Sequence, residues 1–156
     1  MISLVRVDDR LVHAQVVVGW IEFLRCRDVL VVDDTVAWDR DRLDLFRMVI
    51  PQEIRLDAVD VRDLAEQSPK IGQSEKPYLL LFANPLMLAA AVDLGFRPRV
   101  VNLGGMHESP GRHSWLHGLF ASDLEIAAIR RMIGMGIEFE IRTVPAAKPR
   151  EVSGDL

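Results

Sequence analysis

Short runs of apolar residues alternate along this chain with longer segments in which apolar residues recur every three or four positions. The short runs, which are typical of strands, cover residues 2–7, 28–33, 54–59, 78–83, 99–103 and 137–144; those at 54–59 and 137–144 alternate apolar with charged residues. The segments with helical spacing cover residues 14–24, 43–50, 61–67, 85–94 and 122–133. Because a helical segment follows each of the first five strands, the pattern predicts successive βαβ units.

Several residues mark where these helices begin and end. Asn84 and Pro85 are typical of an N-cap followed by the first helical residue, and Gly95 is typical of a helix end. Ser122 has Glu125 three positions later, the spacing of a capping box. Residues 68–77 contain two prolines and several charges, which predicts a polar loop after a short helix.

The chain contains no internal repeat and no linker rich in Pro, Gly or Ser, so a single domain is expected over residues 1–145. The predicted fold class is α/β, with a doubly wound, mostly parallel sheet of six or seven strands and helices on both faces. The alternating polarity of 137–144 favours an edge strand, and 146–156 is expected to fray. Ligands of such folds bind beyond the carboxyl ends of the strands, so the turns at 8–13, 33–36, 83–85 and 103–106 are the candidate site.

Composition excludes several classes of protein. The 156 residues are 49% hydrophobic and 27% charged with a net charge of −4, which fits a soluble globular protein and disfavours nucleic acid as a partner. No apolar run approaches the roughly 20 residues that span a bilayer, and the first residues lack signal-peptide features, so a cytoplasmic location is expected. The single cysteine, Cys26, excludes an intramolecular disulfide and is expected to be structural.

The first turn carries the densest set of polar residues. Residues 6–15 include two acids, two arginines and a histidine where a strand leads into a helix. At a helix start, His13 could act as a nucleophile or base, and Arg10 could bind phosphate oxygens at two points. Asp8 or Asp9 could orient the imidazole. An equally supported alternative is that Asp8, Arg10 and His13 only cap the helix and pair with each other.

Other polar positions carry weaker hypotheses. Asp33 and Asp34 resemble the acidic pocket of a phosphoaspartate receiver, but the acceptor Asp and the Lys that a receiver needs on later strands are missing, so turn formation and capping are favoured. His107, His113 and His117 lie in a stretch with Pro and Gly, where their spacing does not converge on a metal, and no metal is expected. Gly104 and Gly105 match no nucleotide fingerprint and indicate a tight turn or a close backbone approach.

Together these motifs resemble the IIB subunits of the mannose/fructose/sorbose class of sugar phosphotransferase systems. The first is Arg6-Val-Asp-Asp-Arg-Leu-Val-His13-Ala-Gln-Val, followed by Trp20. The others are Val31-Val-Asp-Asp34, Leu81-Phe-Ala-Asn-Pro85, Val101-Asn-Leu-Gly-Gly-Met106 and Gly136-Ile-Glu-Phe-Glu-Ile-Arg-Thr-Val-Pro145. The resemblance covers nearly the whole chain.

The resemblance implies that His13 carries a phosphoryl group as a phosphohistidine. The group would come from a phosphorylated IIA protein or domain and pass to a sugar that enters through membrane subunits IIC and IID, with no cofactor. Arg10, Ala14 and Gln15 would surround the phosphoryl group. The wider pocket would include Arg6, Asp8, Asp33, Asp34, Asn84 and Asn102.

The sequence departs from the family pattern at two points. Ala14 stands where the family usually has Gly, and the stretch from Met106 to Trp115 is atypical in its histidines. Both departures bear on the fit to partners more than on chemistry at His13. An alternative function is therefore a phosphorylation-responsive regulatory module that takes no part in sugar transport.

Overall fold

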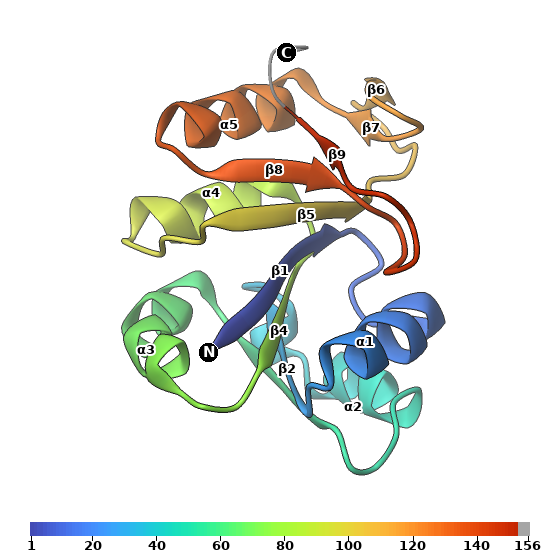
Figure 1. The fold of residues 1–156 in the computed structure, drawn as a ribbon, viewed down its shortest axis with the longest axis vertical. Coiled ribbons are helices and arrows are strands. Elements are labelled where there is room, and N and C mark those ends of the chain that lie inside the picture. Colours follow the sequence, from blue (N-terminus) through green and yellow to red (C-terminus); the bar gives the residue numbers. More distant parts are fainter. Residues whose placement is uncertain (153–156) are drawn as a thin grey trace.

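The computed structural model describes residues 1–152, and its centre is a seven-stranded sheet in the order β3-β2-β4-β1-β5-β8-β9 (Figure 1). The strands of this sheet are β1 Ile2–Asp8, β2 Asp28–Val32, β3 Arg55–Val59, β4 Tyr78–Phe82, β5 Val100–Gly105, β8 Glu138–Ile141 and β9 Arg150–Glu151. All pairs are parallel except β8 with β9. The predicted α/β class and sheet are confirmed.

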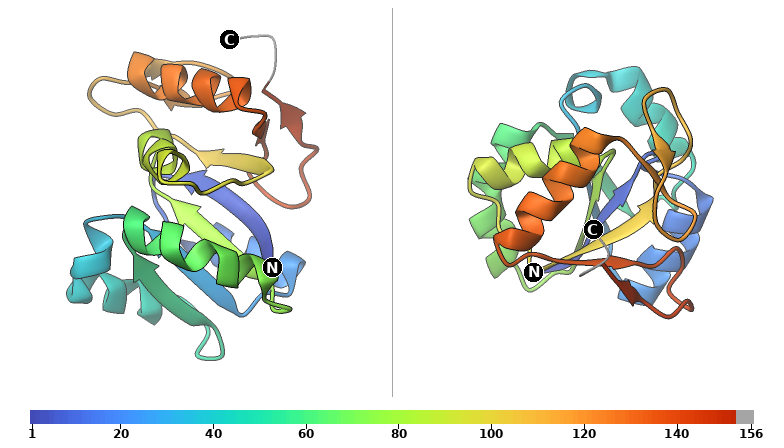
Figure 2. Two further views of the ribbon diagram at one scale, coloured as in Figure 1. Left: turned by 90° about the vertical axis from the view of Figure 1, so that its left-hand side faces the viewer. Right: turned by 90° about the horizontal axis from the view of Figure 1, so that it is seen from above.

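Helices cover both faces of the sheet. They are the π-helix η1 Gln15–Ile21, α1 Glu22–Leu24, the 3₁₀ helix η2 Val36–Trp38, α2 Arg40–Met48, α3 Val61–Gln73, α4 Pro85–Asp93 and α5 Asp123–Gly134. One apolar core lies between the sheet and α3, α4 and α5, which Figure 2 shows stacked along the sheet. A second core, centred on Trp20, joins the other face to η1 and α2.

The predicted caps form as expected. The Asn84 side chain accepts the Met87 N–H at 2.9 Å, and Pro85 begins α4. Ser122 and Glu125 form a reciprocal capping box at the start of α5. Between β5 and α5, a small antiparallel hairpin pairs β6 His113–Ser114 with β7 Phe120–Ala121.

The polar loop predicted for 68–77 is wrong over its first half, because α3 continues through Pro69 to Gln73. Proline removes the N–H that would bond to the carbonyl of Ala65, but the Ser68 hydroxyl donates to that carbonyl at 3.2 Å. Ile71, two residues after Pro69, is buried in the core. Burial of this apolar face therefore outweighs the helix-breaking tendency of Pro69.

The prediction that the last strand is an edge is also wrong. β8 ends at Ile141, and β9 pairs with it antiparallel, so that Arg150 lies opposite Ile141. Val152 is only 3% exposed. Fraying is therefore contradicted for 150–152, because Arg150 and Glu151 extend the sheet and the Val152 side chain joins the core. Residues 153–156 lie outside the described part.

β1 is the strand that positions the candidate site. It pairs with β4 along its length but meets β5 only from Arg6 onward, where Arg6 lies opposite Asn102 and Asp8 opposite Gly105. The carboxyl ends of β1 and β5 are thereby brought side by side in the middle of the sheet. This is where a doubly wound fold places its ligands.

Candidate active site

The turn after β1 is fixed by a buried leucine. The Leu11 N–H donates to the carbonyl of Asp8 at 2.9 Å, and Leu11 has a φ of +53°. This left-handed conformation costs a non-glycine residue on the order of 1–2 kcal/mol. The Leu11 side chain is completely buried in the Trp20 core, and this burial holds the turn in place. This role could not be predicted from the sequence, since Leu11 looks like an ordinary connector residue.

Asp8 holds the imidazole of His13. Its Oδ2 atom lies 3.1 Å from His13 Nε2 and 2.9 Å from NH2 of Arg6. The Asp8 side chain is fully buried, whereas that of His13 is 15% exposed. Within residues 1–152, the Nδ1 atom of His13 makes no hydrogen bond. The ring is therefore anchored through one nitrogen and has the other available.

Arg6 is a buried guanidinium behind Asp8. Its NH1 atom donates to Asn102 Oδ1 at 2.5 Å and to the carbonyl of Arg142 at 3.0 Å, while NH2 also reaches the carbonyl of Thr143 at 3.2 Å. The guanidinium lies 5.4 Å from the centre of the Trp20 ring, within cation–π range. These contacts link the ends of β1, β5 and β8.

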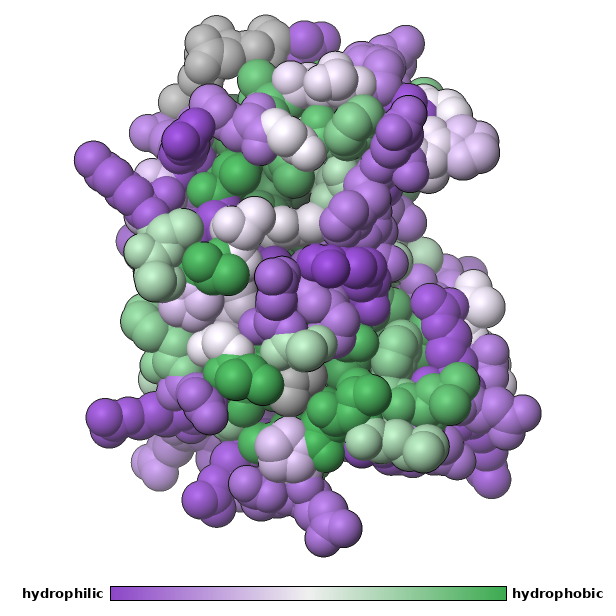
Figure 3. Space-filling view, turned by 90° about the vertical axis from the view of Figure 1, so that its right-hand side faces the viewer, coloured by the Kyte–Doolittle hydropathy of each residue, from purple (hydrophilic) through white to green (hydrophobic). Residues whose placement is uncertain are grey.

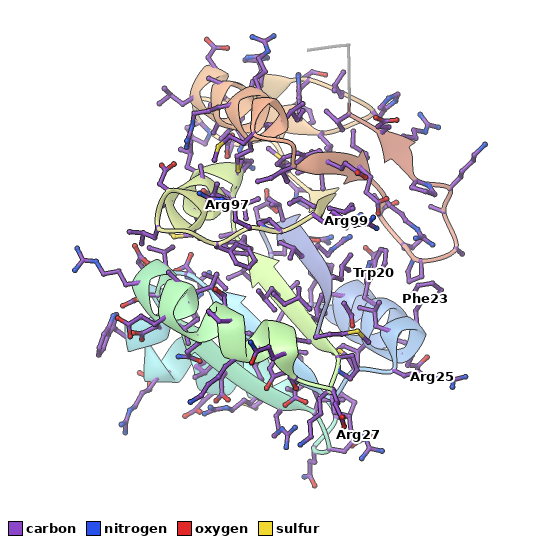
Figure 4. All side chains as sticks on the ribbon, turned by 60° about the vertical axis from the view of Figure 1, so that its left-hand side comes forward. Trp20, Phe23, Arg25, Arg27, Arg97 and Arg99 are labelled. Carbon is purple, nitrogen blue, oxygen red and sulfur yellow. The ribbon has the colours of Figure 1, made fainter. Side chains whose placement is uncertain are left out.

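Trp20 contacts both the chain segment after β8 and an aromatic neighbour in its own helical segment. Its indole N–H donates to the carbonyl of Thr143 at 3.3 Å, and Arg142 lies 5.3 Å from the ring centre. Phe23 projects from the same helical segment (Figure 4) and meets Trp20 edge-on at 6.1 Å. The segment after His13 is thus packed against the loop that follows β8.

Arg6 and Asp8 each shift the pKa of the other. Burial by itself would raise the pKa of Asp8, but the hydrogen bond from His13, the positive charge of Arg6 and the Arg10 N–H outweigh it and lower the pKa below its ordinary value. Burial lowers the pKa of Arg6, and the attraction of Asp8 opposes that shift. Asp8 is therefore a carboxylate at neutral pH, facing His13.

Gly104 and Gly105 make room for this pair. A Cβ atom at Gly104 would lie 1.9–2.2 Å from the Arg6 guanidinium, and one at Gly105 would lie 2.8–3.1 Å from the Asp8 carboxylate. The close approach that the glycine pair indicated is confirmed, and the approaching groups are Arg6 and Asp8. Of the wider pocket residues, Arg6, Asp8 and Asn102 form one hydrogen-bonded cluster with His13.

The predicted phosphoryl-binding residues lie on the solvent side of this cluster. The Arg10 N–H donates to Asp8 Oδ1 at 3.2 Å, and its half-exposed side chain places Nε 3.6 Å from the same oxygen. Ala14 and Gln15 are exposed where the helix begins. All three lie within three positions of His13 in the sequence.

Asp33, Asp34 and Asn84 are engaged elsewhere. Asp33 Oδ1 accepts the N–H groups of Thr35 and Val36, both at 2.9 Å, and so stabilises the turn that leads into η2. Asp34 Oδ1 accepts the Val61 N–H at 3.1 Å. Within the described part of the chain, none of the three forms a hydrogen bond or ion pair with the His13 cluster. Asn84 borders a neighbouring cavity of about 390 Å³ that Asp9 also lines.

A second network, which was not predicted from the sequence, lies on the other side of the turn. Asp9 accepts hydrogen bonds from the His107 backbone and from Arg112, and it contacts the His107 ring. Arg112 also forms a two-point ion pair with Glu125. Arg112 and Glu125 are 13 residues apart, a spacing that matches no local sequence pattern, so their ion pair is seen only in the folded structure.

The two remaining histidines, His113 and His117, contact different partners. His113 contacts Asp123 and His117 contacts Arg150. Among residues 1–152, no group of three His, Cys, Asp or Glu side chains could hold a metal ion. Cys26 is buried, and burial raises the pKa of its thiol, in keeping with its expected structural role.

Known proteins are similar to this chain in both sequence and fold. Residues 2–154 match the family described as the PTS system sorbose subfamily IIB component. The chain belongs to this family. A sorbose-subfamily IIB component is a subunit of a sugar phosphotransferase system (PTS), and its activity is phosphoryl transfer to sugar.

The relatives of this IIB component carry several sugar names. It is 28% identical to the fructose-specific EIIB component of Bacillus subtilis, over 93% of this chain and 89% of that protein. It is 31% identical to the mannose-specific EIIAB component of Escherichia coli, over 92% of this chain and 45% of that protein. The IIBSor domain of the Klebsiella pneumoniae sorbose permease is 25% identical, covers 96% of this chain and 92% of that domain, and superposes with a TM-score of 0.86. These matches favour the phosphocarrier function over the regulatory alternative.

The IIB component contains, within residues 1–152, no helix that is long and apolar enough to cross a membrane.

Proposed function

We propose that His13 is the residue of this IIB component that carries the phosphoryl group, and that the group is bonded to Nδ1. The observation that supports this assignment is the anchoring of Nε2 by the buried Asp8 carboxylate, 3.1 Å away, which leaves Nδ1 as the free nitrogen. With the proton on Nε2 and donated to Asp8, the lone pair of Nδ1 is the nucleophile.

In the incoming step, the Nδ1 lone pair attacks phosphorus and the P–N bond of the donor phosphohistidine breaks. The His13 ring becomes a phosphorylated imidazolium, and Asp8 stabilises its positive charge through the Nε2–H hydrogen bond. Arg6 neutralises Asp8 from behind, so that a buried carboxylate is tolerated. Because the donor is already activated, positioning and charge suffice and no cofactor is required.

Arg10 is the side chain that would hold the phosphoryl oxygens. A phosphoryl group carries a charge of roughly −1.5 to −2 near neutral pH, and a guanidinium binds two of its oxygens at once. Arg10 is half-exposed, so its side chain can turn from Asp8 toward an arriving group. The start of the helix behind His13 contributes further positive potential.

The donor we infer is a phosphorylated IIA protein or domain. The mannose-specific relative from E. coli is named an EIIAB component, and this chain matches less than half of it. Figure 3 shows the face where the helix after His13 and α2 lie, with apolar side chains gathered below a polar band. Val18, Phe23, Leu45 and Met48 are exposed apolar residues of these helices, suited to a protein partner.

The acceptor in this proposal is a sugar delivered by membrane subunits IIC and IID at the cytoplasmic face of the membrane. Incubation with a phosphorylated IIA donor should add one acid-labile phosphoryl group per chain. His13→Ala should add none, while His113→Ala, at an exposed histidine of the β6–β7 hairpin, should be labelled normally. Labelling of folded His13→Ala to the wild-type extent would contradict the assignment.

A further inference from the structure

A cavity of about 330 Å³ lies at the edge of the sheet opposite His13. It is lined by the chain segments that lead into the adjacent strands β3, β2 and β4. His13 follows the carboxyl end of β1, whereas this cavity lies at the amino ends of strands that run parallel to β1. The proposed function therefore leaves the cavity without a role.

Most of the side chains that line the cavity are charged, and the cations outnumber the acids. Figure 4 shows Arg25 and Arg27 on the segment that joins α1 to β2. The cationic members are Arg25, Arg27, Arg55 and Lys76, and the acidic members are Asp28 and Glu53. The lining therefore carries a net charge of +2, in a chain whose net charge is −4.

Asp28 is neutralised by an ion pair within the lining. Nε and NH2 of Arg55 donate to its two carboxylate oxygens at 2.6 and 2.7 Å. The Asp28 side chain is only 9% exposed. Because Arg55 balances the charge of Asp28, Glu53 is the acid of the lining that opposes the remaining three cations.

These three cations are available to a ligand. Within residues 1–152, the side chains of Arg25, Arg27 and Lys76 are exposed and form no hydrogen bond or ion pair. The backbone that carries them is ordered by local contacts. Arg25 ends α1 in a left-handed conformation with a φ of +50°, and the Arg27 carbonyl accepts the Arg55 N–H at 2.7 Å. The turn thus brings both arginines to one cavity.

The charge of the cavity fits the phosphate of a phosphomonoester. Such a phosphate carries roughly −1.5 to −2 charges near neutral pH, and a guanidinium binds two of its oxygens at once. A carboxylate or a phosphodiester carries a single negative charge and balances only half of the +2. The volume lies at the lower end of the range for small-molecule sites, about 300–1,000 Å³.

We propose that this cavity binds a sugar phosphate, whose phosphate group contacts Arg25, Arg27 and Lys76. Sugar phosphates are the phosphomonoesters that phosphoryl transfer to sugar produces, so the ligand belongs to the product class of the family's own reaction. The inference does not depend on the role of His13, because recognition takes place at the opposite edge of the sheet. A IIB component with this site senses the products of its transport system.

The test measures binding of mannose 6-phosphate to the whole chain by calorimetry, with the ionic strength held constant by NaCl because salt screens exposed charges. Amide signals in NMR spectra locate the bound ligand. Mannose and phosphatidylglycerol vesicles are the comparison ligands, since the first lacks the phosphate and the second presents a lipid phosphodiester. Arg130→Gln is the matched control, because Arg130 is an exposed arginine of α5 that does not line the cavity.

We expect mannose 6-phosphate to shift the amide signals of Arg27 and Lys76, and mannose not to bind. Arg27→Gln and Lys76→Gln should each weaken binding about tenfold, the scale for a hydrogen bond to a charged group, while Arg130→Gln binds as wild type does. Glu53→Gln should tighten binding about twofold to fivefold, because it removes the opposing acid.

Four results would overturn the inference. The first is that mannose 6-phosphate does not bind, or binds no better than mannose. The second is equal affinity in wild type and Arg27→Gln, or an equal loss in Arg130→Gln, which would reveal a general attraction to surface cations. The third is binding to the vesicles alone. The fourth is a set of shifts confined to residues 8–13, which would place the ligand at the turn that carries His13.

Discussion

The guanidinium of Arg6 occupies the space that a side chain at Gly104 would fill. A Cβ atom there would approach three atoms of the guanidinium to within 2.2 Å, far inside contact distance. Because Arg6 also holds Asp8, the size of residue 104 determines whether the charged cluster behind His13 can form.

Gly104→Ala should therefore destabilise the protein by about 1–3 kcal/mol, the range for an overpacked interior, and slow phosphoryl acceptance. Urea unfolding measures the first effect. The control is Gly72→Ala in α3, where a Cβ meets nothing within 4 Å and helix propensity favours alanine. If both variants unfold at the same urea concentration, Arg6 does not need the space beside Gly104.

Asp8→Asn should abolish phosphoryl acceptance and lower the free energy of unfolding at pH 7 by about 3–5 kcal/mol, because the buried Arg6 loses its counter-charge. The folded-state pKa of Asp8 is lowered, so the stabilisation is fully present above the unfolded pKa of about 3.9 and is lost as the pH falls through the folded value. Urea titrations should show a constant difference between wild type and Asp8→Asn from pH 7 to 5 and a narrowing below about pH 4. A difference that vanishes by pH 5 would mean that the pKa of Asp8 is raised.

Arg10→Lys should leave the fold intact and slow phosphoryl acceptance about tenfold, which corresponds to about 1.4 kcal/mol, because a point charge replaces the planar guanidinium. Rapid mixing with phosphorylated IIA gives the rate. Arg131→Lys is the matched control, since the Arg131 side chain is equally exposed, at 46%, and pairs with Asp93. Equal rates for wild type and Arg10→Lys would show that the Arg10 guanidinium does not bind the phosphoryl group and only contacts Asp8.

Ala14→Gly should lower the free energy of unfolding by less than about 1 kcal/mol and leave phosphoryl acceptance as fast or faster. Ala14 has helical backbone angles at an exposed helix start, so glycine costs backbone entropy but removes a methyl group from the path of the donor. Thermal unfolding and the acceptance rate check the two effects. Loss of acceptance in a folded Ala14→Gly protein would show that the methyl is a required contact.

Local chemistry explains which parts of the fold could be predicted from the sequence. The Asn84 and Ser122 caps depend on residues within three positions, and both were predicted correctly. The path of the chain through Pro69 and the pairing of β9 depend on burial and on a distant strand edge, which local patterns do not encode.

The same distinction applies to the candidate site. The closeness of Asp8, Arg10 and His13 followed from their spacing in one turn, and the glycine pair correctly indicated a close approach. The ties from Asp9 to Arg112, and from Arg6 to Asn102, join segments about a hundred residues apart. Only the alignment of β1 beside β5 brings these groups together.

Asp8 and Asp9 connect the turn that carries His13 to the helix layers on both faces of the sheet. Through Arg6, Asp8 is tied to the layer that contains Trp20, and through Arg112, Asp9 is tied to the first turn of α5 on the opposite layer. Loosening of either layer is therefore transmitted to His13. We therefore expect the backbone amides of the turn at residues 8–13 to exchange only when the whole domain unfolds, whereas the amides of the surrounding surface loops exchange through local opening.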